Sequence, residues 1–358
     1  MSPCGAGVTG IGVFLPQTVR RNDWWPDSVV SRWMERRASQ VPPREPEQLP
    51  EGARRVFAAI TELSGDPFRG GRERRVMDRG MTASEMEVLA AEEALHRSGV
   101  PRSEIGALLT YNQLPDFLIV PTSARVHHQL GLPSRCFTLG TEGACNSFLM
   151  QLHLADQMIR SGAVEHALLV QSSQVQHLIR QQDEHSAWFG DGATAVVVSR
   201  VPEGEGLLHQ SHLTDGSLHR VLVGGTPGKR WYDGEPIHLY FDDHEASVRM
   251  LAQLPDMGKL VLNDCFQTTG LTPGDVDFYA AHQGTVWFRR VTQAYAGMER
   301  ARYFDSYPWT TSLGAANIPF ELAMAQREGL LRKGDLVAAH SGGSGIVVSG
   351  ALMRWCVT

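Results

Sequence analysis

Continuous apolar runs alternate along this chain with stretches whose apolar residues recur at helical spacing. The apolar runs predict buried strands over residues 8–15, 107–111, 136–139, 167–172, 188–198, 277–282, 336–340 and 346–352. Helical spacing predicts helices over residues 84–98, 122–130, 148–161, 243–269 and 319–328, the first opened by a capping box at Ser84 and Glu87. Apolar strands that alternate with helices indicate an α/β protein whose sheets are covered on both faces.

Both halves of the chain close with the same pattern, a strand, a glycine turn and a second strand. The glycine turn and second strand fall in residues 190–198 of the first half and 343–351 of the second. This weak internal similarity suggests a duplicated unit. We therefore predict two similar domains, residues 1–203 and 204–358, that meet near residues 201–206.

Residues 24–69 differ in character from the rest of the first half. Trp24, Trp25 and Trp33 predict a short amphipathic helix, and residues 42–50 are rich in proline and charge. We interpret this insertion as an arm that lies over the surface rather than in the core. Its composition fits a disordered loop without a role as well as it fits a substrate lid.

Composition narrows the class of function. The chain has 358 residues, a net charge of −6 and no long basic run, which argues against nucleic acid or an anionic membrane as a partner. No apolar stretch is long enough to span a bilayer, and we see no secretion signal. Five scattered cysteines without a CxxC pair predict reduced thiols and a cytoplasmic protein. No histidine pair has the context of zinc ligands, so we predict no metal.

Cys145 has a distinctive place in the pattern. It lies where the predicted strand 136–139 turns into the helix 148–161. The partial positive charge of a helix N-terminus lowers the pKa of a thiol and raises the fraction of thiolate, which attacks carbonyl groups. A lone cysteine is more often an inert buried residue, so the rest of the chain has to decide between the two interpretations.

Five stretches of the sequence form an ordered series of motifs: residues 71–75, 143–148 with 155–163, 189–193, 275–283 and 344–352. In this order, they resemble the β-ketoacyl-acyl-carrier-protein synthase III group of thiolase-like condensing enzymes. The resemblance covers most of the chain and is poor over residues 24–69 and 218–240. It implies two similar αβαβα halves in a five-layered core, and a homodimer whose catalytic site lies between the halves.

The resemblance also implies roles for single residues. Cys145 would be the nucleophile that becomes acylated, and His282 the imidazole that accepts its proton or stabilises the thiolate. The backbone N–H groups of Cys145 and Gly345 would form the oxyanion hole. Substrate-binding positions are implied at Val120, Phe189 and Gly343.

The third catalytic residue departs from the family's pattern. This chain has Ser312 where the family has an asparagine, and an asparagine follows only at position 317. In the family, that amide and the imidazole stabilise the enolate formed as CO₂ leaves, and removing one such donor typically costs about 10²–10³ in rate. Ser312 therefore puts decarboxylative condensation in doubt and leaves acylation of Cys145 untouched. Whether Ser312 or Asn317 replaces the family's amide stays open.

Two smaller departures concern the substrates. The tryptophan and arginine with which the family sandwiches the adenine of coenzyme A align near Ser64 and Phe68. Coenzyme A is then held differently, or the donor is a carrier protein; either thioester is a substrate, and no cofactor is implied. Val120 aligns with the residue that reaches across the dimer to the acyl pocket, where it either admits a bulkier acyl group or simply packs.

We predict an acyltransferase of natural-product biosynthesis. It would load Cys145 from an acyl-CoA or an acyl carrier protein and pass the acyl group to an O-, N- or S-nucleophile of a small molecule. The alternative is a Claisen condensation, decarboxylative or not, of the polyketide and fatty acid type. A third interpretation, a non-catalytic partner subunit of a condensing heterodimer, is disfavoured because both Cys145 and His282 are present.

Overall fold

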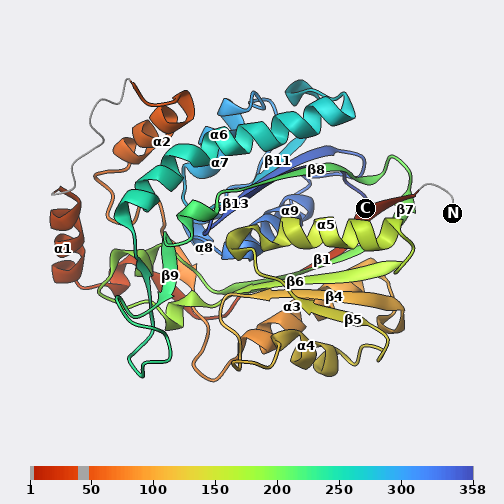
Figure 1. Ribbon diagram of the computed structural model, residues 1–358, viewed down its shortest axis with the longest axis horizontal. Helices are drawn as coiled ribbons and strands as arrows, with labels where there is room; N and C mark the ends of the chain where they lie inside the picture. Colours follow the sequence, from red (N-terminus) through yellow and green to blue (C-terminus); the bar gives the residue numbers. More distant parts are fainter. Residues whose placement is uncertain (1–3, 39–47, 358) are drawn as a thin grey trace.

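Two β-sheets, one from each half of the chain, enclose a pair of helices in the computed structural model, which describes residues 4–38 and 48–357 (Figure 1). The first sheet has the strand order β1-β7-β6-β4-β5 and the second β11-β12-β13-β8. The strands of the first sheet are β1 (Cys4–Phe14), β4 (Ile105–Asn112), β5 (Phe137–Gly140), β6 (His166–Ser173) and β7 (Gly192–Pro202). Those of the second are β8 (Gly206–Thr214), β11 (Phe278–Ala281), β12 (Leu336–Gly343) and β13 (Val347–Arg354).

The two sheets repeat one arrangement. In the first, β7 pairs antiparallel with β1 and β6, and β4 runs parallel to β6. In the second, β13 pairs antiparallel with β8 and β12, and β11 runs parallel to β12. Only β5, at the free edge of the first sheet, lacks a counterpart in the second sheet as the structure describes it. This is the topology expected of a duplicated unit, and the domain boundary at 203/204 stays a prediction.

Helices cover both faces of both sheets (Figure 1). The central helices α5 (Ser147–Arg160) and α9 (Asn317–Arg327) bury Phe148, Leu152, Ile318 and Leu322 in one apolar cluster with both sheets. The outer helices are α3 (Ala83–Ser98) and α4 (Thr122–Leu130) on the first sheet, and α6 (His244–Thr269) and α7 (Phe288–Tyr295) on the second. The predicted α/β fold with a five-layered core is therefore confirmed.

The start of α3 corrects one local prediction. Its capping box is formed by Thr82, whose hydroxyl accepts from the Glu85 backbone N–H while the Glu85 carboxylate accepts from the Thr82 N–H. The box predicted at Ser84 and Glu87 is wrong, because both residues are fully buried inside the helix. Two overlapping candidate boxes lie in the same stretch, and only packing distinguishes them.

The arm at residues 24–69 is more buried than the sequence predicts. It contains α1 (Asp27–Ala38) and α2 (Glu51–Glu62). Trp25 and Trp33 are buried in a cluster with Ala187, and Val56 of α2 packs in the core beneath α6. The prediction that the arm lies over the surface rather than in the core is thus wrong for these residues. Most of the proline-rich run, residues 42–47, lies outside the described part of the chain.

The remaining strands and the remaining α-helix are short. They are β2 (Val19–Arg21) paired with β3 (Glu73–Arg75), β9 (Leu222–Gly225) paired with β10 (His238–Phe241), and α8 (Tyr307–Thr310).

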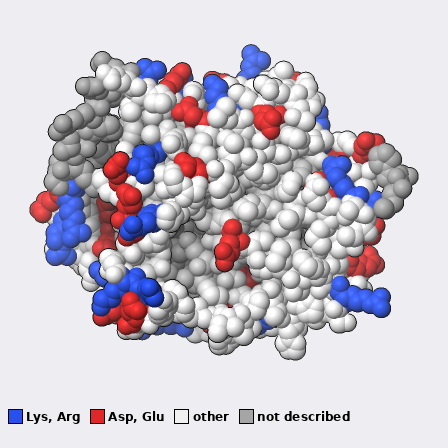
Figure 2. All heavy atoms as spheres, viewed as in Figure 1, with Lys and Arg blue, Asp and Glu red and all other residues white. Residues whose placement is uncertain are grey.

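The described part of the chain contains no helix with the length and apolar character of a membrane span. Figure 2 shows one face of the molecule, on which basic and acidic side chains are intermixed near the margins and sparse across the middle.

Candidate active site

A tight turn places Cys145 just before α5. A one-turn 3₁₀ helix, Ala144–Asn146, leads into α5, and Ala144 has a φ of 47°, which is costly for a residue other than glycine. The Ser147 hydroxyl accepts from the Gly143 N–H at 3.0 Å and donates to the Ala144 carbonyl at 2.8 Å. These two hydrogen bonds hold the turn closed and fix the position of the cysteine at its tip.

The second half of the chain packs directly on this turn. A Cβ atom added at Gly343 would lie 2.3 Å from the Gly143 carbonyl oxygen, so only glycine allows this approach of the two backbones. The Ser341 hydroxyl, also on β12, donates to the Cys145 carbonyl at 3.0 Å. The reactive turn of one half is therefore anchored by a strand of the other.

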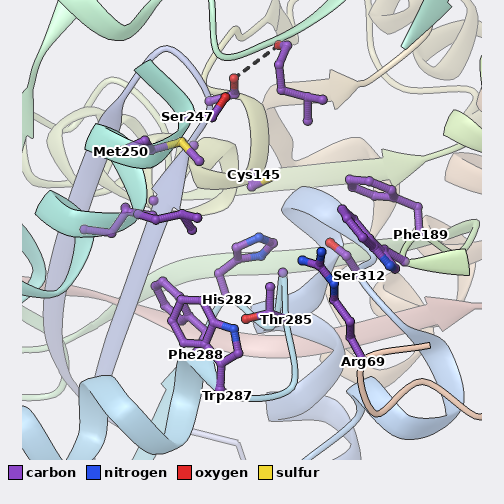
Figure 3. A pocket seen from close by; sticks show the side chains of 18 of the residues that line it. Arg69, Cys145, Phe189, Ser247, Met250, His282, Thr285, Trp287, Phe288 and Ser312 are labelled. Atoms are coloured by element: carbon purple, nitrogen blue, oxygen red, sulfur yellow. Dashed lines mark hydrogen bonds between the residues drawn. The ribbon is translucent and has the colours of Figure 1, made fainter. Parts of the chain in front are cut away.

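Cys145 lines a cavity of about 1040 Å³, its open mouth included (Figure 3). Five of the residues implicated from the sequence line it: Cys145, Phe189, His282, Ser312 and Gly343. Most of the other walls are apolar and aromatic, and come from Trp188, Leu222, Phe241, Met250, Leu251, Leu254, Trp287 and Phe288.

His282 enters the cavity from the end of β11. Its backbone N–H donates to the His340 carbonyl at 2.9 Å, and its ring lies 6.2 Å from the ring of Phe288, edge to face. A Cβ atom at Gly284, which also lines the cavity, would lie 2.7 Å from Nε2. Glycine at this position therefore leaves the Nε2 edge of the imidazole open toward the cavity.

Burial keeps the thiol and the imidazole uncharged. It raises the pKa of Cys145 to about 11 and, together with the neighbouring His340, lowers the pKa of His282 to about 4. The sequence-based expectation of a lowered thiol pKa is therefore wrong. The cost of desolvating a thiolate exceeds the effect of the helix terminus. At neutral pH, the cavity is therefore lined by a neutral thiol and a neutral imidazole.

Ser312 and Asn317 occupy different places. The Ser312 N–H donates to the Trp188 carbonyl at 2.9 Å, and its side chain lines the cavity. Asn317 begins α9 away from the cavity lining, and its side-chain oxygen accepts from the Leu313 N–H at 3.1 Å. Its side chain acts on the His282 ring, whose pKa it raises against the larger effect of burial. Neither Nδ2 of Asn317 nor Nδ1 of His282 has a hydrogen bond of ordinary geometry among the described residues.

Two implicated residues lie off the cavity. Gly345 has a φ of 105° and does not line it, whereas the preceding residue, Ser344, does. Val120 is 55% exposed in an apolar loop elsewhere on the surface. The structure also adds Arg69 and Trp188 to the lining. Their only signal in the sequence is their place next to two of the matching stretches, residues 71–75 and 189–193.

A metal centre has no support in the described residues, since they contain no group of three or more histidine, cysteine or acidic side chains placed to bind an ion.

Family models and individual relatives both relate this chain to the same group of enzymes. Residues 140–216 match the family model of 3-oxoacyl-[acyl-carrier-protein] synthase III, and residues 266–355 match the model of its C-terminal part. β-Ketoacyl-[acyl-carrier-protein] synthase III of Rhizorhabdus wittichii is 29% identical over 298 residues, 80% of this chain and 88% of that protein. The enzyme of the same name from Brucella canis is 27% identical over 312 residues, 84% of this chain and 93% of that protein.

Solved structures agree on the fold. The 3-oxoacyl-[acyl-carrier-protein] synthase III of Aquifex aeolicus superposes with a TM-score of 0.79 at 22% identity, over 98% of this chain and 100% of that one. A variant of OleA from Xanthomonas campestris also gives 0.79, at 18% identity and over 98% of both chains. The molecule is thus a thiolase-fold protein. Within that class, the chain is similar to 3-oxoacyl-[acyl-carrier-protein] synthase III in two separate stretches and along most of its length.

Proposed function

We propose that the protein joins an acyl group held on Cys145 to a second thioester by a Claisen condensation. The observation that carries this proposal is that Cys145 and His282, from opposite halves of the chain, line one apolar cavity. The similarity to synthase III enzymes along most of the chain supports it. The donors we propose are acyl-CoA or an acyl carrier protein.

In the first step, the Cys145 sulfur attacks the carbonyl carbon of the donor thioester. Its proton moves to His282, which then gives a proton to the departing thiol as the donor's C–S bond breaks. Because both groups rest uncharged, the thiolate forms only as the proton is transferred. We place the oxyanion donors at the backbone N–H groups of Cys145 and Ser344, in place of Gly345, because Ser344 lines the cavity.

In the second step, the enolate carbon of the second thioester attacks the acyl carbonyl. With a malonyl thioester, loss of CO₂ supplies this enolate. The new C–C bond forms as the bond from the acyl carbon to Cys145 breaks, and the thiolate recovers a proton. His282 and Ser312 are the side chains that we place at the enolate oxygen.

One observation favours a second candidate. The cavity presents the short hydroxyl of Ser312 where the family presents an amide, and Asn317 does not line it. Stabilisation of an enolate is thereby weakened, whereas transfer to an oxygen or nitrogen nucleophile needs only His282 as base. The second candidate is therefore acyl transfer to a small-molecule acceptor, as in natural-product pathways.

The two candidates are separated by products. Intact-protein mass spectrometry after incubation with acetyl-CoA and octanoyl-CoA should show acyl adducts that are absent from Cys145→Ala. Adding malonyl-CoA should then release CO₂ and a 3-oxoacyl thioester. If no thioester loads Cys145, both candidates fail. If it loads and is discharged only by alcohols or amines, the transfer reaction is correct.

We further propose a homodimer, supported by the surface around β5. This strand is the free edge of the first sheet, and Phe137 on it is 50% exposed. The run Phe117, Leu118, Ile119 and Val120, which leads into α4, is also exposed, with Ile119 fully so. Exposed apolar runs beside an unpaired edge are typical of interfaces. Light scattering should give twice the monomer mass, and Ile119→Asp should shift the protein toward monomer.

A further inference from the structure

Arg69 is the one cationic side chain among the described residues that line the cavity. Figure 3 shows it extending from its loop into the cavity, on the side of Ser312. Its guanidinium lies 4.0 Å from the centre of a ring of Trp188, whose carbonyl accepts from the Ser312 N–H. The cation therefore belongs to the same wall as Ser312.

The position of Arg69 is built by its loop. The Asp66 carboxylate accepts from the N–H groups of Phe68 and Gly70 at 2.8 and 2.6 Å, and the Arg69 N–H donates to the Asp66 carbonyl at 3.2 Å. Arg69 has a φ of 49°, which is uncommon for a residue with a side chain. The loop thus holds an arginine in a conformation that would suit glycine, and aims it at the cavity.

The charge of Arg69 is incompletely compensated. Glu184 is the acidic partner, but one of its oxygens accepts from Arg37 Nε at 2.8 Å, and the other lies 3.5 Å from the Arg69 guanidinium. Two cations therefore share one carboxylate. Burial lowers the pKa of Arg69, with Glu184 opposing that effect, as expected for a cation that lacks a full counter-charge.

We propose that Arg69 binds a carboxylate carried by a substrate, so that the enzyme prefers substrates with a terminal carboxylate to neutral ones of equal length. A planar guanidinium can donate two parallel hydrogen bonds to a carboxylate, and the apolar walls strengthen such a pair. One surplus charge matches a carboxylate better than it matches a phosphate dianion. This inference rests on the proposed function, because the carboxylate has to arrive on a thioester used at Cys145.

The test compares glutaryl-CoA with pentanoyl-CoA, which have the same chain length. In one arm, each is the donor, and loading of Cys145 is followed by mass spectrometry. In the other arm, each competes with malonyl-CoA for protein preloaded with a butyryl group, and the loss of 3-oxoacyl product is followed. The first arm reports a carboxylate on the loaded acyl group, and the second a carboxylate on the acceptor.

We expect a preference for glutaryl-CoA in at least one arm. Arg69→Gln should reduce that preference by about tenfold or more, the usual worth of a hydrogen bond to a charged group. Arg69→Lys should retain part of the preference. Arg54→Gln, an exposed arginine on α2, is the matched control and should change nothing.

Two results would overturn the inference. One is the absence of a preference in both arms. The other is an equal loss for both thioesters in Arg69→Gln, which would mean that Arg69 contacts the coenzyme A they share. If no thioester loads Cys145, the proposed function fails, and the inference is tested separately by thiol labelling. 3-Maleimidopropionate should then label Cys145 faster than N-ethylmaleimide, and Arg69→Gln should abolish the difference.

Discussion

The two halves of the molecule enter their central helices through the same turn and use it differently. A one-turn 3₁₀ helix precedes each helix, Ala144–Asn146 before α5 and Gly314–Ala316 before α9. The first residue of each helix accepts a hydrogen bond from the N–H group four positions earlier, Ser147 from Gly143 and Asn317 from Leu313. The middle residue of the turn is Cys145 in one half and Ala315 in the other.

This comparison gives Asn317 a structural role. It is the counterpart of Ser147, because its side-chain oxygen closes the turn before α9 just as the serine hydroxyl closes the turn before α5. That task uses only Oδ1 of Asn317, whereas its Nδ2 has no hydrogen bond of ordinary geometry among the described residues, and the same side chain raises the pKa of His282. Duplication has thus supplied two equivalent turns, and one side chain decides which of them is reactive.

The largest effect on acyl loading should come from substitutions at Cys145 and Ala315, the middle residues of the two turns. Cys145→Ala should abolish acyl loading. In that background, Ala315→Cys should not restore it, because Ala315 is only 1% exposed and does not line the cavity. Mass spectrometry with octanoyl-CoA measures both variants. An acyl adduct on the cysteine at position 315 would mean that both turns can hold a reactive thiol, which contradicts the proposed difference between them.

His282→Ala should lower the rate of loading by about 10²–10⁴, the usual contribution of a positioned acid–base group. Single-turnover kinetics measures this rate. The circular dichroism spectrum and melting temperature of the variant should stay near those of the parent protein, which shows that the variant is folded. His340→Ala is a poor control, because that ring is fully buried against Phe288. If His282→Ala left the loading rate unchanged, His282 would not be the acid–base group for acylation of Cys145.

Ser312→Asn should raise the rate of CO₂ release from malonyl-CoA by about 10²–10³, because it restores a second donor to the enolate oxygen. Radiolabelled malonyl-CoA gives the measurement. No increase would mean that the parent protein already has a complete donor set, and would return Asn317 to consideration.

The pH dependence of thiol labelling tests whether the helix N-terminus, which lowers the pKa of Cys145, or burial, which raises it, has the larger effect. With a Cys145 pKa of about 11, the rate of alkylation by iodoacetamide should rise about tenfold for each pH unit between pH 7 and 10, in step with the thiolate fraction. His282 titrates near pH 4 and contributes nothing in that range. A plateau near pH 7 would show that the helix terminus outweighs desolvation.

The smallest effect should come from Asn317→Ala. Loss of the hydrogen bond to Leu313 should lower the free energy of unfolding by about 0.5–2 kcal/mol, as for other helix-start side chains, while loading of Cys145 changes little. Asn317→Ser, which mimics Ser147, should recover much of the loss. Urea unfolding checks stability, and a large fall in CO₂ release with unchanged stability would contradict the structural role.

The layered fold could be predicted because its signals are local and repeated. Apolar strands, helical spacing and glycine turns each occur in both halves, and Asp243–Thr269 was predicted almost to the residue. The arm could not be placed in the same way. Trp25 and Trp33 fit a surface helix by spacing alone, and their burial depends on Phe68 and Ala187, which are distant in sequence.

The cavity lining was predictable where it adjoins a strand or a glycine turn, as at Cys145, His282 and Phe189. The pKa of Cys145 was not, since it depends on burial by walls from both halves. Arg69 belongs to a loop outside the matching stretches, and only the fold brings it to Trp188. The sequence pattern predicts the backbone position of a residue at the end of a strand or turn, but not the groups that surround its reactive side-chain atom.

The contact of Gly343 with the turn of Cys145 has an evolutionary consequence. Neither half contains the whole site, so a single ancestral unit would have needed a second copy of itself to bring a histidine to its cysteine. In such a pair both turns would have carried the thiol. With the two halves in one chain, a single thiol is enough for one site, and the middle residue of the second turn is Ala315.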